Sequence, residues 1–373
     1  MANVNDSHNM FNYGPEYGDY GREWLITNSA GSGPFMLTEV RQQEYVHAVR
    51  FDDYHLPWHA EAPTAMRLVV TGDPATLRAL LANHELEMTD NWQSPETLDA
   101  LASIDGVELG RFSFWASQDI HFNNRLAPMD CPDFRRGMAS LIDYDQIVAT
   151  LFPGSNRATG PVHAGMPGAN LDLVPYTFDV DKAKEYFSAS MYADQLDQFD
   201  VEFFAISEVP VQERIGLFIQ AAAREAGITV SITQAPYLNL MERYTTIETT
   251  PHMATLSEAP KWNDASATLA SRYGSGAAGT IQQGEWILSP EYDEMLSQAM
   301  KIPDINERHA AYKEIQAHIV EQSFSGFLAD ITERVAYNAS YVHWPAAEMA
   351  KQGTINYNVL GYHFWFFDFR ITS

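Results

Sequence analysis

The chain has 373 residues, which suffices for two domains or one large two-lobed α/β domain. Its 49 acidic and 23 basic side chains give a formal net charge of −26, so nucleic acid and anionic membrane surfaces are unfavourable partners. The single cysteine, Cys131, excludes an internal disulfide and a multi-cysteine metal site. We expect no membrane helix, which needs about 20 apolar residues, and no signal peptide, because residues 1–14 contain neither a basic nor an apolar segment.

The first predicted element is a β-hairpin. Two apolar alternating runs, 35–37 and 45–49, flank the polar turn 41–44, and the sequence Gly-Ser-Gly-Pro at 31–34 precedes them. This pattern is typical of two antiparallel strands that are entered through a turn.

Two strand–helix units are predicted to follow the hairpin. In the first, a strand at 66–70 leads to a helix that starts at Asp73, and residues 86–89 return as a strand. In the second, residues 94–106 form a helix and residues 107–123 form strands.

The middle of the chain continues this alternation. An amphipathic helix pair is predicted within 133–153, with Asp143 as the N-cap of its second helix. The elements after it are, in chain order, a loop at 154–170, a short helix capped by Asp179 or Asp181, a strand at 200–207, and a long helix that ends at Gly227 before another strand.

The last third is predicted to be less regular. Residues 252–288 are loop-rich with one strand at 253–256, and residues 289–323 form a helical hairpin that is broken at Pro303. Short strands and aromatic loops follow from Phe324. The alternation of strands and helices along the chain indicates the α/β class.

Catalytic motifs are absent from the sequence. It contains no G-x-S-x-G elbow, no P-loop and no G-x-G-x-x-G after a strand. Three weaker patterns are better explained as incidental. They are a metal site from the paired histidines of the loop "YHLPWH" (His55, His59), a nucleophile pair (His121, Cys131) and a glycosidase carboxylate pair (Glu258, Asp264).

Aromatic residues gather in the loop-rich segment and indicate a binding site. They are mixed there with short polar side chains, as in the walls of a small-molecule or peptide cleft. The alternative is that the rings simply pack under long loops. The residues concerned are Trp262, Asn263, Asp264, Tyr273 and Trp286. We therefore expect a binding protein rather than an enzyme, with no cofactor and no metal.

Several segments, in collinear order from about residue 20 to 345, resemble the family 5 extracellular solute-binding proteins. These proteins are the peptide and nickel class that serve ABC importers. The matching segments are "SAGSGPFMLTEVRQQEYVHAVRFDDY", "DPATLRALLANHELEMTD", "IHFNNRLAPMDCPDFRRGMASLIDYDQIVATLFPG", "YTFDVDKAKEYFSASMY", "IQAAAREAGITVSI" and "LSPEYDEMLSQAMKIPDINERHAAYKEIQAHIVEQS".

The resemblance implies a type II periplasmic-binding fold, in which two α/β lobes close on a ligand about a hinge. It implies lobe I over 1–125, lobe II over 126–325, and a return to lobe I over 326–373. The implied function is capture of an oligopeptide or peptide-like solute for the membrane subunits of an ABC importer, in the periplasm or outside the cell. Asn123, in the motif "IHFNN", and Asp264, in "APKWNDASATLASRYGSG", match family motifs. Asp264 is the residue expected to pair with a peptide α-ammonium.

The chain departs from the family at its start. The segment at 24–55 normally follows a first strand-rich segment and a small domain, so we expect an incomplete first lobe and a complementing N-terminal chain as one candidate partner. One alternative function is therefore that of a fragment or split-protein subunit whose sheet edge pairs with another chain. A second and disfavoured alternative is a hydrolase that uses Glu258 and Asp264.

Overall fold

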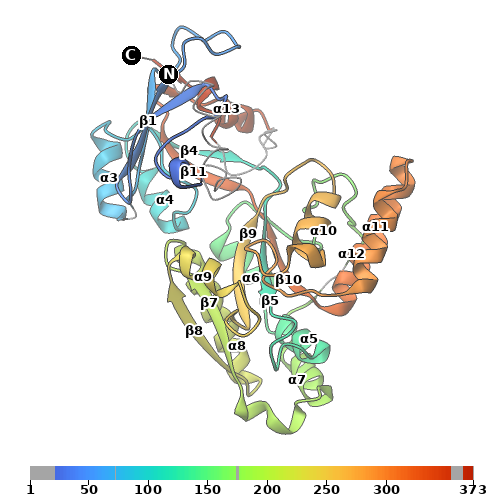
Figure 1. Cartoon of the computed structure of the whole chain (residues 1–373). Coiled ribbons are helices and arrows are strands. Elements are labelled where there is room, and N and C mark those ends of the chain that lie inside the picture. The colour runs from blue at the N-terminus through green and yellow to red at the C-terminus, as the bar shows by residue number, and fades with distance from the viewer. Residues whose placement is uncertain (1–21, 72, 174–175, 354–363, 373) are drawn as a thin grey trace.

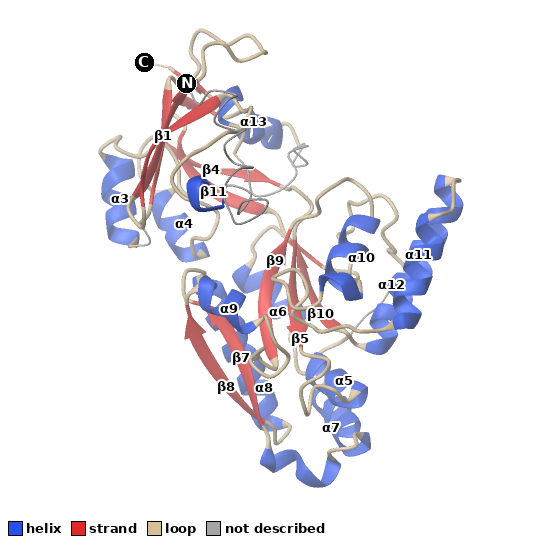
Figure 2. Ribbon diagram, viewed as in Figure 1, coloured by secondary structure: helices blue, strands red, loops and turns tan. Residues whose placement is uncertain are grey.

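The computed structural model describes residues 22–71, 73–173, 176–353 and 364–372, which form two lobes (Figure 1). The first lobe contains the first and the last described residues, and the second contains the middle of the chain (Figure 1). In lobe II, helices lie on both sides of the strands (Figure 2).

Lobe I is built from short antiparallel sheets and a few helices. One sheet has the order β1-β2-β3, and the pairs β4–β11 and β12–β13 form two others. Its strands are β1 (Phe35–Arg41), β2 (Tyr45–Arg50), β3 (Ala65–Val69), β4 (Val107–Phe112), β11 (Glu333–Asn338), β12 (Val342–His343) and β13 (Arg370–Ile371). Its helices are α2 (Arg22–Leu25), α3 (Pro74–Ala82), α4 (Pro95–Leu101), α13 (Pro345–Lys351) and the 3₁₀ turn η3 (Phe366–Asp368).

Lobe II is a six-stranded mixed sheet with helices on both faces. The strand order is β6-β10-β5-β9-β7-β8, in which β7 runs parallel to both of its neighbours. Its strands are β5 (Ser117–Phe122), β6 (Asn156–Arg157), β7 (Asp200–Ile206), β8 (Thr229–Ala235), β9 (Met253–Glu258) and β10 (Ser325–Asp330). Its helices are α5 (Pro132–Ser140), α6 (Tyr144–Leu151), α7 (Val180–Ala189), η1 (Ala193–Gln198), α8 (Pro210–Glu225), α9 (Tyr237–Arg243), α10 (Ser266–Tyr273), η2 (Ser275–Ala277), α11 (Pro290–Met300) and α12 (Ile305–Gln322).

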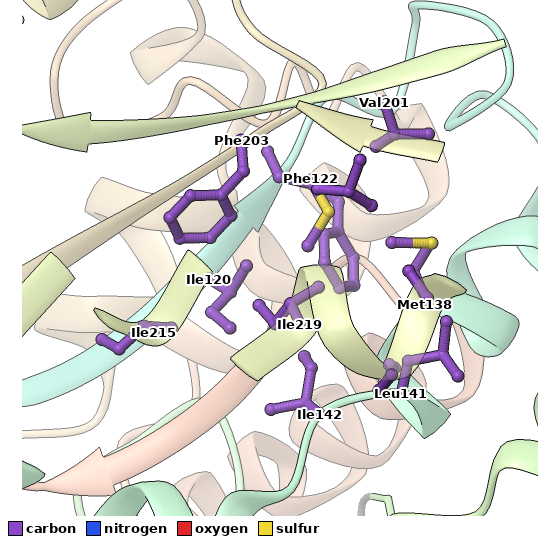
Figure 3. Packing of buried hydrophobic residues seen from close by; sticks show 14 of the residues in the cluster. Ile120, Phe122, Met138, Leu141, Ile142, Val201, Phe203, Ile215 and Ile219 are labelled. Atoms are coloured by element: carbon purple, nitrogen blue, oxygen red, sulfur yellow. The ribbon is translucent and has the colours of Figure 1, made fainter. Parts of the chain in front are cut away.

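The two faces of the lobe II sheet differ in chemistry. Ile120 and Phe122 of β5 point into the largest core, where they pack with Phe203 and with Ile219 of α8 (Figure 3). Each of these side chains is fully buried, which stabilises the fold by about 1.5–3 kcal/mol per side chain. Because side chains alternate along a strand, the β5 residues Asp119 and His121 face the opposite side, where Asp119 pairs with Arg272 of α10.

Two antiparallel chain segments connect the lobes. β4 continues into β5 through residues 113–116, and β10 continues into β11 through residues 331–332. The amide of Ile331 donates to the carbonyl of Ala116 (2.8 Å), so the two segments are tied together at the crossing. We therefore propose domain boundaries at these crossings. They differ from the predicted boundary at residue 125, because β5 already belongs to the lobe II sheet.

Most predicted elements are present in the structure. The hairpin forms with Arg41 opposite Tyr45, and Asp143 caps α6 by accepting from the Gln146 amide (3.1 Å). The short helix α7 is capped by Asp179, which accepts from the amide of Lys182. The described part of the return to lobe I is β11, β12, α13 and residues 364–372, while residues 354–363 and 373 lie outside the described residues.

Three local predictions were wrong. Residues 86–89 do not form a strand, because only Met88 pairs with the sheet, as a single bridge to Tyr337. The loop-rich segment contains the helix α10, and α13 follows a Trp344-Pro345 start that was read as aromatic loop. In both helices the alanine-rich sequence has good helix propensity, but the helices are too short to show a clear hydrophobic period.

Candidate functional site

A cleft lies between the lobes, next to the crossing segments. Residues of both lobes and of the crossing line it, which is the arrangement needed for a ligand to be enclosed by lobe closure. Lobe I contributes Asn91, Trp92, Gln93, Pro95 and Leu98, lobe II contributes Gln118, Leu151, Phe152, Pro153, Val209 and Val211, and the crossing and start of β11 contribute Ile331, Thr332, Glu333 and Arg334.

The lining is mainly apolar with a few polar groups. Its accessible volume is about 60 Å³, enough for a few water molecules at roughly 10–15 Å³ each but too small for a peptide. A peptide-sized ligand therefore requires the lobes to separate before they close on it.

Two polar contacts bridge the lobes beside the cleft. Glu96 of α4 accepts from Arg214 of α8 through both carboxylate oxygens (2.9 and 3.0 Å). Arg111 of β4 donates to the carbonyl of Gly154, in the loop after α6 (3.3 Å). The Glu96–Arg214 pair is solvent-exposed, and such pairs contribute about 0.2–1 kcal/mol. These contacts hold the lobes together only weakly, as opening of the cleft requires.

Trp262, Asn263 and Asp264 lie together on the segment that leads into α10. The Trp262 ring donates to the Ser266 hydroxyl (3.0 Å), and Trp262 remains 43% exposed. Burial alone would raise the pKa of Asp264, but hydrogen bonds from Ser266 and His309 lower it below its ordinary value. The carboxylate is therefore an ionised group that already has local partners, and its contact with a ligand remains a prediction.

The other predicted site residues lie apart from these three. The buried Asn123 amide donates to the carbonyls of Ile247 (3.0 Å) and Thr250 (3.2 Å), so it braces the end of β5 far from the crossing. Trp286 donates to the Thr250 hydroxyl at the same end (2.9 Å), and the fully buried Tyr273 packs on Tyr292. None of the six predicted residues belongs to the lining given above, and the structure does not bring the six together.

A buried charged cluster occupies the polar face of the lobe II sheet. Arg272 of α10 is 1% exposed and forms ion pairs with Asp119, with Glu285 and with Glu258 (3.0 Å). Burial raises the pKa of Glu258 to about 8 and that of Asp119 to about 7, although Arg272 counteracts both rises. His121 lies 3.2 Å from Glu285, and burial together with Arg272 lowers its pKa well below its usual value.

The geometry does not support the hydrolase alternative or a metal site at the paired histidines. Glu258 is bound to Arg272, whereas Asp264 is bound to Ser266 and His309, so the two carboxylates do not act as a pair. Within the described ranges, no group of His, Cys, Asp and Glu could hold a metal ion, which includes the loop with His55.

The cleft-lining residues were missed at the level of sequence. Trp92, Val209 and Val211 belong to a lobe I loop and to the start of α8, far apart in the chain. A cleft of this kind depends on how two lobes face each other, and local patterns do not encode that arrangement. The family resemblance predicted that a ligand would lie between two lobes, but it did not predict which residues line the space between them.

The comparisons with known proteins show the family to which the chain belongs. Residues 6–280 match the description "Bacterial extracellular solute-binding proteins, family 5 Middle", and the chain belongs to this family. The "Probable D,D-dipeptide-binding periplasmic protein DdpA" of Escherichia coli (strain K12) is 23% identical over 322 residues, which are 86% of this chain and 60% of that protein. The chain thus spans about 60% of the length of this curated relative.

Solved structures show the same fold. The periplasmic binding protein DppA from Helicobacter pylori, in complex with the peptide STSA, has a TM-score of 0.78 at 19% identity, over 92% of this chain and 63% of that one. The dipeptide-binding protein from Pseudoalteromonas sp. SM9913, in complex with Met-Leu, has a TM-score of 0.74 at 21% identity, over 83% and 61%. NikA from Brucella suis, in complex with Fe(III)-EDTA, has a TM-score of 0.73 at 19% identity, over 92% and 68%. The prediction of a two-lobed periplasmic-binding fold is confirmed.

Proposed function

We propose that this chain captures a peptide-like solute between its lobes and delivers it to the membrane subunits of an ABC importer. The observation that carries this proposal is the cleft, which is lined from both lobes and from the segments that connect them. Mostly apolar walls with a few convergent polar groups suit a small organic ligand. The relatives support the ligand class, since two of them are described in complex with peptides.

The function proposed is binding without chemistry. The relatives are solute-binding proteins, and the carboxylates weighed for hydrolysis are bound to other side chains. Family 5 proteins act in the periplasm or outside the cell, and we propose the same location for this chain. No helix within the described residues is long and apolar enough to cross a membrane.

A thermal-stability screen tests the proposal. A ligand that binds only the folded chain stabilises it by RT ln(1 + [L]/Kd), which is about 2.7 kcal/mol at 100-fold excess over Kd. We expect peptides such as Met-Leu and Ser-Thr-Ser-Ala to raise the melting temperature, and sugars of similar size to leave it unchanged. A panel of di- to pentapeptides that produced no shift, with no binding by calorimetry, would contradict the proposal.

Asp264 stays a proposed ligand contact within this function. An Asp264→Ala protein should bind peptide more weakly if the carboxylate pairs with the ligand ammonium. Full retention of affinity would end that assignment without affecting the cleft.

A second candidate function rests on the β1–β3 sheet. Leu68, Val69 and Val70 at its β3 edge are 45–67% exposed, and among the described residues no strand pairs with the outer side of β3. We propose that an extended segment, equivalent to part of the additional length of the relatives, covers this edge. A Leu68→Lys protein should then be more soluble alone and should fail to pair with such a segment supplied as a separate chain. Unchanged pairing would reject this candidate.

A further inference from the structure

Glu333 stands in an unusual position for an acidic residue. It is the first residue of β11, directly after the crossing between the lobes, and it lines the cleft although only 6% of its surface is exposed. Burying a carboxylate without a cation is costly, so such residues usually have a basic partner. Within the described ranges, Glu333 forms no ion pair.

The arginine side chains around the cleft have partners other than Glu333. Arg334 pairs with Asp99 of α4, and Arg214 pairs with Glu96. Arg111, opposite Arg334 in the β4–β11 pair, donates across the cleft to a backbone carbonyl. The remaining charge that acts on Glu333 is Asp90, a like charge that disfavours ionisation.

The environment therefore keeps the Glu333 carboxyl in its neutral form. Burial raises its pKa to about 8, and the Asp90 charge adds to the rise, while the neighbouring Asn91 amide counteracts part of it. The cleft thus holds a buried acid that has no cation partner among the described residues, and a charged group of a ligand could pair with it.

We propose that Glu333, which lines the cleft, and not Asp264, which lies outside its lining, is the counter-charge for a protonated amine of the ligand, so that the cleft selects solutes with an ammonium group on an apolar body. The inference rests on the proposed function and specifies which charge of the solute is recognised. An ammonium ion brought into the cleft forms a charge-assisted hydrogen bond with the ionised carboxylate. The walls from Trp92, Leu98 and Val211 would contact the apolar part.

The test compares two ligands that differ only in the amine. Met-Leu and N-acetyl-Met-Leu are titrated calorimetrically at pH 6.5 into the native chain, the Glu333→Gln chain and the Asp105→Asn chain. Asp105 is an exposed acid of lobe I outside the cleft and is the matched control. We expect the native and Asp105→Asn proteins to bind Met-Leu at least 10-fold more tightly than the acetylated form. In Glu333→Gln this preference should fall below about threefold.

Proton release provides a second readout. A peptide amine is mostly protonated at pH 6.5, since its pKa is about 7.7–8.0. The free Glu333 carboxyl is also protonated at this pH and becomes ionised on binding, so close to one proton is released per ligand. Titrations in two buffers with different ionisation enthalpies measure this release, which should vanish in Glu333→Gln.

The outcomes distinguish a failure of the Glu333 inference from a failure of the proposed function. An amine preference that survives in Glu333→Gln overturns the inference, as does a preference that is lost in an Asp264→Asn protein instead. Equal binding of both ligands by the native chain also overturns the inference and leaves the capture of peptides standing. No binding of Met-Leu, Ser-Thr-Ser-Ala or other short peptides overturns the proposed function, and the inference falls with it.

Discussion

Removing Arg272 should destabilise lobe II strongly, because this residue is the only guanidinium that faces the buried carboxylates Asp119, Glu258 and Glu285 within the described residues. We consider Arg272→Met, which keeps much of the side-chain volume and removes the charge. Three acids would then share a buried site without a cation.

The magnitude follows from the burial. Breaking a buried ion pair by removing one partner costs about 3–5 kcal/mol, because the other charge is left uncompensated. For a chain of this size, that corresponds to a fall in melting temperature of about 6–20 °C, at roughly 2–4 °C per kcal/mol. The loss should be larger at pH 8 than at pH 5.5, where Asp119 and Glu258, with pKa values of about 7 and about 8, are protonated and carry no charge.

The assay is scanning calorimetry of the native and Arg272→Met chains at both pH values. An all-neutral variant, Arg272→Met combined with Asp119→Asn, Glu258→Gln and Glu285→Gln, is the informative partner. This variant leaves no unpaired charge in the buried site, so it should recover part of the stability that Arg272→Met loses.

Two results would refute this reasoning. The first is an Arg272→Met protein whose melting temperature lies within about 2 °C of the native value at pH 8, since the cluster would then contribute less than ~1 kcal/mol. The second is an all-neutral variant that is no more stable than Arg272→Met, because packing rather than charge would then explain the cost.

Two further predictions concern pH and packing. Burial raises the pKa of Asp330 from 3.8 to about 7 and that of Glu333 from 4.5 to about 8, so their contribution to stability is full below pH ~4 and is lost as the pH rises to about 8. An Asp330→Asn, Glu333→Gln protein should therefore lose less thermal stability than the native chain between pH 5 and 8.5, and parallel curves would contradict this. A Cβ on Gly284 would lie 2.2 Å from the Tyr244 ring, whereas one on Gly276 would meet nothing within 4 Å. By urea denaturation, Gly284→Ala should cost about 1–3 kcal/mol and Gly276→Ala well under 1 kcal/mol, and equal costs would show that Tyr244 can move aside.

Local sequence patterns predicted much of the fold, because caps and alternation are short-range signals. Asp73 before Pro74 and Asp143 before Tyr144 mark helix starts, and both cap as expected. The prediction of strands over residues 107–123 also placed β4 and β5 correctly. The helix α10 was missed because it is short and because its inward face also carries Arg272, a charged residue that a hydrophobic pattern assigns to solvent.

The candidate site was harder to predict, because its residues meet only through the arrangement of two lobes. The aromatic cluster pointed to Trp262, Tyr273 and Trp286, which the fold separates and of which it buries Tyr273 completely. Glu333 carries no local sign of its position, since an isolated acid at a strand start normally faces water. The crossing of β10 into β11 brings it into the cleft.

The most direct test of the central claim is whether a peptide binds in the cleft between the lobes. Met-Leu can be titrated calorimetrically into the native chain, a Gln93→Trp chain, in which the indole fills the cleft from lobe I, and a Gln42→Trp chain, in which it lies on the exposed hairpin turn. The account predicts one peptide per native chain, unchanged affinity in Gln42→Trp, and at least a 10-fold loss in Gln93→Trp. Equal affinities in all three proteins would show that any peptide binds elsewhere and would contradict the account.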